Sequence, residues 1–301
     1  MSLQSATSIR WHSSSSDRAT TSLRHMAAQG DDESIPYLVE AINRASNEEV
    51  FTEIAEMCID VFFKESLGAK PEDKIAPWKE IQIGSLKTLQ TADLQRRRTI
   101  YPKTNEMFLA YKVEPVPSSS IDKPLILDLD TVQNLQREEG KEYVRGEIIG
   151  FVEITQKPYG LGQGKGRAVY DDEPIPPLRP ILTNLAVKKS VRKYGVGSKL
   201  LDACEEHVQN TWEMGEIVLE VEDFNTGALD FYSNREFDTL YDDPASRRYD
   251  VGGFVLRKVR CTRKVMRKEF EGFGSDSDSK GEDEAVTIDA DFFNRKKSSV
   301  S

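Results

Sequence analysis

The hydrophobic and polar positions between residues 37 and 268 follow two periods. Apolar residues at every second position, or in short blocks, predict strands, whereas spacings of three and four predict helices. Strands are predicted at 37–44, 107–113, 146–154, 181–187, 216–222, 237–241 and 254–267. Helices are predicted at 47–63, 77–98, 195–213 and 225–234. This order predicts an α+β domain with a mixed sheet, in which the crossover over 181–222 forms a right-handed parallel pair.

Two stretches interrupt the periodic pattern. Residues 114–143 are predicted to be an insertion, part loop and part weak helix. Residues 156–180 are rich in glycine and proline, which indicates a long connection. Asn47 is expected to cap the first helix. Cys58 and Cys204 occupy apolar helical positions, so we expect both to be core residues.

The two ends of the chain differ in composition from the periodic region, which is expected to form one domain over 35–270. The first 30 residues hold eight Ser, three Thr, three Arg and a single acid, Asp17. This composition is typical of a transit peptide and favours a plastid location for residues 1–34, with a mitochondrial location as an alternative. A disordered tail of a cytosolic protein is the other interpretation. Residues 271–301, with eight acids against four bases, are expected to be a disordered acidic tail.

Charge and hydropathy exclude some classes of protein. The net charge of −10 argues against nonspecific nucleic-acid binding, which depends on Lys and Arg neutralising phosphates. The sequence contains no run of about 18 apolar residues, so no transmembrane helix is predicted. The three cysteines lie far apart, so no disulfide framework is expected.

The segment from Leu185 to Gly197 predicts an anion site. A strand ends, a short polar turn follows, and a helix begins at two glycines. The first amides of a helix have no partner within it and attract anions. Gly195 and Gly197 let a phosphate approach the backbone, and Arg192 and Lys193 lie beside it.

The run Arg-Lys-Tyr-Gly-Val-Gly at 192–197 resembles the R/Q-x-x-G-x-G/A signature of the GNAT N-acetyltransferase superfamily. Downstream, Asn225, Ala228, Tyr232 and Phe237 also resemble that family's pattern, and 184–187 with 204–212 resemble its plant and cyanobacterial plastid-type branch. The resemblance implies a mostly antiparallel sheet with helices on both faces and a splayed parallel pair of the fourth and fifth strands. It implies an acetyl-CoA site made by Leu185, Ala186, Val187, Arg192, Lys193, Tyr194, Gly195, Val196, Gly197, Asn225, Ala228 and Tyr232.

The same resemblance implies acetyl transfer from acetyl-CoA to a primary amine of a protein, on a lysine or at an N-terminus, without a metal. A backbone N–H of Val187 or its neighbour would stabilise the oxyanion. Tyr232 is expected to be the general acid, since a phenol remains protonated at working pH. Glu220 is the first candidate for the base, with Glu222, Glu153 or a water relay as alternatives. An arylalkylamine acetyltransferase and a non-catalytic acyl-CoA-binding module remain as alternative functions.

Four further features bear on these expectations. Glu236 stands where the family usually has glycine, and Gly160–Gly166 is expected to be a flexible loop near the acceptor. The basic stretch 257–268 is expected to be a solvated strand. His207 lies in the helix 195–213, away from the amine site, and is expected to be structural.

Overall fold

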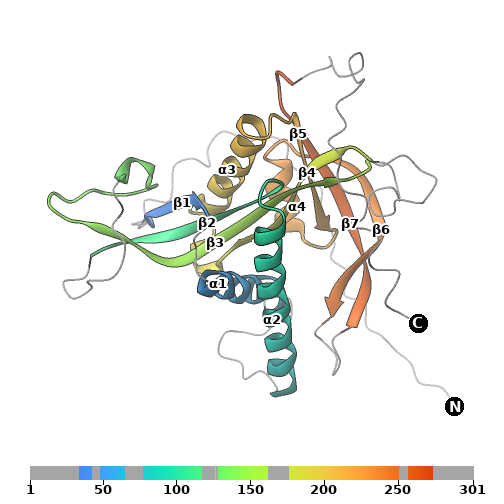
Figure 1. The fold of residues 1–301 in the computed structure, drawn as a ribbon, viewed down its shortest axis with the longest axis horizontal. Coiled ribbons are helices and arrows are strands. Elements are labelled where there is room, and N and C mark those ends of the chain that lie inside the picture. The colour runs from blue at the N-terminus through green and yellow to red at the C-terminus, as the bar shows by residue number, and fades with distance from the viewer. Residues whose placement is uncertain are drawn as a thin grey trace, which may run out of the picture. The chain divides into compact units, whose positions relative to one another are not determined.

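The computed structural model describes residues 34–42, 48–64, 77–116, 126, 128–161, 176–250 and 257–273. In this part of the chain seven strands form one sheet in the order β1-β2-β3-β4-β5-β7-β6 (Figure 1). The strands are β1 Tyr37–Ala41, β2 Asn105–Pro115, β3 Tyr143–Pro158, β4 Leu178–Val187, β5 Glu216–Glu222, β6 Asp238–Asp250 and β7 Arg257–Glu269. Only β4 and β5 pair in parallel, which confirms the predicted mixed, mostly antiparallel sheet.

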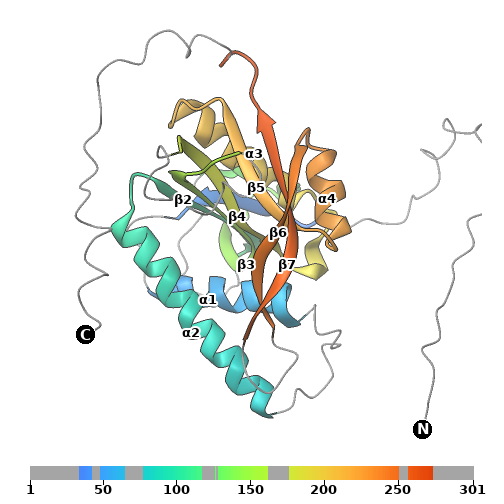
Figure 2. The ribbon, with the colours of Figure 1, turned by 90° about the vertical axis from the view of Figure 1, so that its right-hand side faces the viewer.

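Helices cover both faces of the sheet, as predicted. They are α1 Glu48–Ile59, α2 Pro77–Ile100, α3 Val196–Asn210 and α4 Thr226–Ser233. Side chains of α3 and α4 share one core with Val152, Ile217 and Leu219 of the sheet. Side chains of α1 and α2 share a second core with Met107 and Phe151 on the opposite face, as Figures 1 and 2 show.

Helix α3 packs closely against the sheet because its apolar stripe lies over a glycine of β3, a position that has no side chain. Its buried residues include Leu200 and Cys204, both with no exposed surface, so Cys204 is a core residue as predicted. A Cβ atom on Gly150 of β3 would lie 2.8 Å from Leu200 Cδ1 and 3.1 Å from Val196 Cγ1. Glycine at 150 therefore sets the short distance between α3 and the sheet.

The predicted connection over 156–180 is shorter than expected. Strand β3 continues to Pro158 and β4 begins at Leu178, where the two residues pair. Proline lacks the N–H that a strand ladder uses, so Pro158 and Pro180 masked the strand ends in the sequence pattern. Residues 162–175, with most of the glycine-rich loop, lie outside the described residues.

The insertion between β2 and β3 borders the edge strand β1. Its described part contains one 3-10 turn, Leu129–Thr131, where a weak helix was expected. Gln133 N donates to Tyr37 O over 2.7 Å, and Tyr37 N donates to Gln133 O over 3.1 Å. Val132 and Ile126 bury their side chains against Leu38 of β1. The insertion thus covers the edge of the sheet.

Several predictions concern residues that the structure does not describe. They include Asn47 as a helix cap and almost all of the predicted N-terminal segment 1–34 and acidic tail 271–301. Within the described residues, no helix combines the length and the apolar character needed to cross a membrane.

Candidate active site

The strands β4 and β5 separate after two paired residues. Ile181 pairs with Val218 and Leu182 with Leu219, and no further pairs follow although β4 continues to Val187 and β5 to Glu222. The expected splay of the fourth and fifth strands is therefore present. Thr183 on β4 and Glu220 on β5 are the first residues beyond the paired region.

The backbone of β4 presents amides to this splay. Lys188 N donates to Ile149 O of β3 over 3.0 Å. Successive N–H groups of an extended strand point to opposite edges, so the N–H of Val187 points away from β3, towards the side that β5 has left. Val187, the residue expected to donate to an oxyanion, has the matching orientation.

A β-bulge lies in β4 at the same level. Phe151 pairs with Ala186 and Glu153 with Thr183, so β4 has one more residue than β3 between these pairs. Asn184 lies inside the bulge with φ +57°, a left-handed conformation that asparagine adopts more readily than most residues. Such bulges bend a strand and redirect its groups.

The start of α3 has the backbone arrangement expected of an anion site. Gly195 caps the helix with φ +86°, and Lys199 N donates to Gly195 O over 3.0 Å. The amides of Val196, Gly197 and Ser198 precede that bond and have no partner inside the helix. Exposed Arg192 lies at the end of β4, where its Nε donates to Val187 O over 3.1 Å.

Gly197 lies where three segments identified in the sequence analysis come together. A Cβ atom on this residue would lie 3.7 Å from Val187 Cγ2 and 3.8 Å from Phe231 Cζ, which are ordinary contacts. The packing of the chain itself therefore has room for a side chain at 197. The end of β4, the start of α3 and the helix α4 meet around this bare backbone, which suits a ligand that must approach it closely.

Helix α4 places Tyr232 in the core beside α3. Asn225 caps the helix as predicted, with its Oδ1 accepting from Ala228 N over 3.2 Å. Tyr232 is 6% exposed, and its ring packs edge-on against Phe231 and Phe237. Burial, and to a smaller extent the nearby Cys204, raises the pKa of Tyr232 above its ordinary value. Its phenol therefore carries its proton throughout the neutral range.

Glu220 has two partners, one from the residue that follows β3 and one from β7, the neighbour of β5 on the side away from β4. Tyr159 donates its hydroxyl to Glu220 Oε1 over 2.9 Å, and Arg263 Nη1 lies 3.1 Å from Glu220 Oε2. Burial and the charge of Glu220 raise the pKa of Tyr159. Glu222 lies farther from the guanidinium, with 3.8 Å between its Oε1 and Arg263 Nη2.

Sequence reasoning missed both partners of Glu220. Tyr159 fell within the predicted loop 156–180, and Arg263 within the basic stretch predicted to be solvated. The structure corrects the second prediction in part, because β7 lies inside the sheet, between β5 and β6. Five of its basic residues form ion pairs with acids of neighbouring elements: Arg257, Arg263, Lys264, Arg267 and Lys268.

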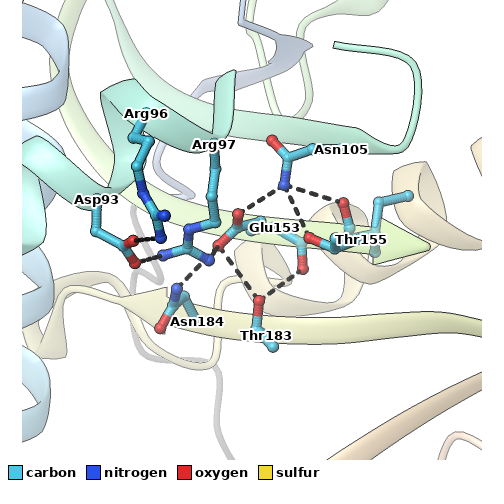
Figure 3. Close-up of polar contacts among 9 residues, drawn as sticks. Asp93, Arg96, Arg97, Asn105, Glu153, Thr155, Thr183 and Asn184 are labelled. Atoms are coloured by element: carbon cyan, nitrogen blue, oxygen red, sulfur yellow. Dashed lines mark hydrogen bonds and ion pairs between the residues drawn. The ribbon is translucent and has the colours of Figure 1, made fainter. Parts of the chain in front are cut away.

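Glu153 lies under α2 with no exposed surface (Figure 3). It accepts from Arg97 Nη1 over 2.5 Å, Asn105 Nδ2 over 2.7 Å, Asn184 Nδ2 over 3.0 Å and Thr183 Oγ1 over 3.3 Å. Burial raises the pKa of Glu153, although the charge of Arg97 and these hydrogen bonds oppose the shift. This candidate for the base is thus enclosed by protein groups.

His207 packs in the core as expected of a structural residue. Its ring lies 5.9 Å from that of Phe108 and 5.0 Å from that of Trp212, both edge-on. Burial lowers the pKa of His207, so the neutral imidazole is favoured.

Comparisons with known proteins agree with this geometry. The sequence profile of the Acetyltransferase (GNAT) family matches residues 104–237. A relative from Danio rerio, N-alpha-acetyltransferase 60, is 33% identical over 97 residues, which are 31% of this chain and 40% of the relative. The chain thus matches less than half the length of that relative.

Solved structures share the general arrangement at low sequence identity. One is Arabidopsis thaliana NAA60 in complex with acetyl-CoA, at 14% identity and TM-score 0.43, covering 78% of this chain and 99% of that one. Another is the NatC complex bound to Gag peptide and CoA, at 15% identity and TM-score 0.42, covering 78% and 98%. The similarity to the acetyltransferase (GNAT) family therefore lies in residues 104–237, the segment that contains β4, the start of α3 and α4.

Proposed function

We propose that this protein is an acetyl-CoA-dependent N-acetyltransferase of protein amines, with the α-amine of a protein N-terminus as its first acceptor and the lysine side chain as its second. The observation that carries the proposal is the meeting of the splayed β4 and β5 with the glycine-opened start of α3. The choice of the α-amine is supported by the name of the matched relative, an N-alpha-acetyltransferase.

The chain offers separate groups for the two parts of the donor. The free amides at the start of α3, with Arg192 and Lys193, suit the pyrophosphate of coenzyme A. Leu185, Ala186 and Val187 on the splayed part of β4 offer backbone groups to an extended arm that carries amides. The methyl-sized room at Gly197 lies between these two sites.

Three groups of the chain act on the reacting atoms. The N–H of Val187 stabilises the oxyanion that forms when the amine nitrogen attacks the thioester carbonyl. Glu220 accepts the proton that the amine loses, directly or through one water molecule. Tyr232 donates its proton to the sulfur as the carbon–sulfur bond breaks, and it can do so because burial keeps the phenol protonated.

The surroundings of the three carboxylates favour Glu220 as the base. Glu153 has no exposed surface. Glu222 lies near the end of β5, farther along the strand from the paired region. Glu220 is the first β5 residue beyond that region, and its side chain keeps 15% of its surface exposed.

The proposal is tested by incubating purified protein and acetyl-CoA with three acceptor classes and measuring products by mass spectrometry. These are peptides with a free α-amine and no lysine, peptides with a blocked N-terminus and one lysine, and arylalkylamines. We expect the first class to react fastest and the second more slowly. The Glu220→Gln variant should lose about 10²- to 10⁴-fold in kcat while binding acetyl-CoA normally.

Two results would contradict the proposal. Acetyl-CoA binding without product from any acceptor would identify a non-catalytic binding module. Product from arylalkylamines alone would identify a small-amine acetyltransferase. Wild-type kcat in Glu220→Gln would remove Glu220 from the mechanism.

A further inference from the structure

The enclosed carboxylate of Glu153 is the least expected group in the core. Burial of a carboxylate costs free energy unless charge and hydrogen bonds compensate it. Here both oxygens are occupied: Oε1 accepts from Asn105, and Oε2 accepts from Arg97, Thr183 and Asn184. A group so fully paired and enclosed is suited to holding structure rather than to exchanging protons with an acceptor.

The donors come from elements that are far apart in the sequence. Arg97 lies in α2, where it also pairs with Asp93 over 2.8 Å, and Asn105 lies at the start of β2. Thr183 and Asn184 lie in β4, at the point where that strand leaves β5. Figure 3 shows these side chains converging on Glu153 from α2, β2 and β4.

Asn184 is the donor with a direct link to the reaction. It occupies the bulge of β4 with φ +57°, a conformation that costs free energy for a residue other than glycine. The hydrogen bond from its Nδ2 to Glu153 compensates part of that cost and fixes the extra residue in one place. Leu185 and Val187, whose amides face the splay, follow closely after this fixed point.

We propose that Glu153 is a positioning residue: through Asn184 it holds the β4 bulge, and thereby the Val187 amide that is aimed at the thioester carbonyl. Loss of this anchor leaves the binding of the donor largely intact, because the start of α3 does not contact Glu153. It lowers kcat, because an oxyanion donor acts only when its geometry is correct. The kinetic part of this inference rests on the proposed acetyltransferase function, whereas the structural part does not.

The test compares three single variants of the full-length protein. Glu153→Gln keeps the shape but removes the charge and turns one acceptor into a donor. Asn184→Gly keeps the positive φ at little cost but removes the tether. Both should lower kcat about 10- to 100-fold with KM for acetyl-CoA changed less than about threefold. Both should also shift the backbone amide signals of Leu185 and Val187 in ¹⁵N NMR spectra of the apo protein.

Asn105→Ala is the matched control. It removes a donor to the same carboxylate, but one that has no contact with β4. It should lower Tm without moving the Leu185 and Val187 amide signals and should keep kcat within about twofold. Combining Glu153→Gln with Asn184→Gly should cost little more than either change alone, since both break one link.

Folded Glu153→Gln protein with wild-type kcat and unmoved amide signals would overturn the proposal, as would wild-type kcat in Asn184→Gly. If Glu153→Gln fails to fold, Asn184→Gly decides the question. If the wild-type protein acetylates no acceptor, the proposed function fails, and the amide signals alone still decide whether Glu153 positions β4.

Discussion

Tyr159 and Tyr232 are both buried, but their surroundings favour different roles for their hydroxyl groups. Tyr159 already donates a hydrogen bond to Glu220, so its hydroxyl is engaged with a carboxylate. Tyr232 lies among aromatic rings, and its raised pKa results mainly from the loss of water. A phenol that is removed from water resists ionisation and remains protonated across the neutral range. It therefore still has a proton to give to a thiolate leaving group.

Tyr232→Phe removes the proposed acid and leaves the ring packing intact. We expect kcat to fall about 10²- to 10⁴-fold, the usual effect of general acid catalysis, with acetyl-CoA affinity unchanged. The raised pKa of Tyr232 sets the sign of the pH effect. Its active form is protonated, so the wild-type rate should show no loss through this group below about pH 10. Stopped-assay kinetics from pH 6 to 10, with calorimetric binding of acetyl-CoA, provide the measurement.

Full turnover by the Tyr232→Phe protein would exclude the phenol as the acid. Tyr159→Phe is the matched control, because it removes a second buried hydroxyl from the same region. If that change affects kcat through Glu220, its effect should be absent when Glu220 is already replaced by Gln.

Glu236 shows how a departure from a family pattern appears in the backbone. The family usually has glycine at this position, and Glu236 adopts φ +68°, in the region that favours glycine. Its side chain is exposed, with Lys268 Nζ 3.7 Å away, so this surface pair compensates little of the strain. The change affects the turn after α4 and leaves the packing of Tyr232 against Phe237 in place.

At the scale of the element, α3 depends on two glycines with opposite roles. Gly150, on the strand beneath, has no space for a Cβ atom because Leu200 and Val196 lie within 3.1 Å of that position. Gly197, in the helix, has space for one among the protein atoms. One glycine therefore serves the packing of the helix, and the other leaves room for the ligand proposed to bind at its first turn.

Replacing each glycine by alanine separates these roles. Gly150→Ala should lower the free energy of unfolding by about 1–3 kcal/mol, as overpacking does, and affect binding only secondarily. Gly197→Ala should leave stability unchanged or raise it by up to about 1 kcal/mol, because alanine favours the helix. It should weaken acetyl-CoA binding by about tenfold or more. Urea unfolding and calorimetric titration measure the two quantities, and a Gly197→Ala protein with normal affinity would contradict the proposed ligand site.

Most elements could be predicted from the sequence, because each buries one apolar face with a clear period. The α3 stripe and the alternation of Ile217, Leu219 and Val221 are examples, and α4 begins after the predicted cap Asn225. The ends of β3 and β4 were missed because proline and charge interrupt the pattern there. Strand periodicity also could not show that β6 extends to Asp250, since its far half is polar.

The glycine-opened start of α3 was predictable because its signal lies in consecutive residues. The acceptor side was not, since its groups meet only through tertiary structure. Glu153 was one acid among many in the sequence, and nothing local distinguished it as a fully buried group. Its four donors, spread from Arg97 to Asn184, become neighbours only when α2, β2, β3 and β4 are assembled.

At the scale of the whole molecule, the two faces of the sheet carry different groups. The α3 and α4 face carries the site proposed for the donor, and the α1 and α2 face carries Glu153 and its network (Figure 3). Near the far end of the β6–β7 pair, Tyr249 packs against Ile59 of α1 and Leu86 of α2. The acceptor side is therefore bounded by helices and hairpin together.

We propose that residues 1–34 direct the protein to plastids, from their Ser- and Arg-rich, acid-poor composition. A fusion of residues 1–40 to a fluorescent protein should accumulate in plastids of plant cells. A fusion in which Arg10, Arg18 and Arg24 are replaced by Glu is the control and should remain diffuse. Diffuse or mitochondrial signal from the unaltered fusion would contradict the proposal.

The divergence of β4 and β5 also determines where this sheet can recruit an additional strand. At one outer edge, the main chain of Tyr37 is already bonded to Gln133. At the other, β6 carries Pro244 and charged residues, which discourage association between edges. In the described sheet both outer edges are thus protected, and the unpaired edges of β4 and β5 face each other where the two strands separate. On the proposed function, an extended ligand with amide groups would therefore bond to the inner margins of β4 and β5 rather than to an outer edge of the sheet.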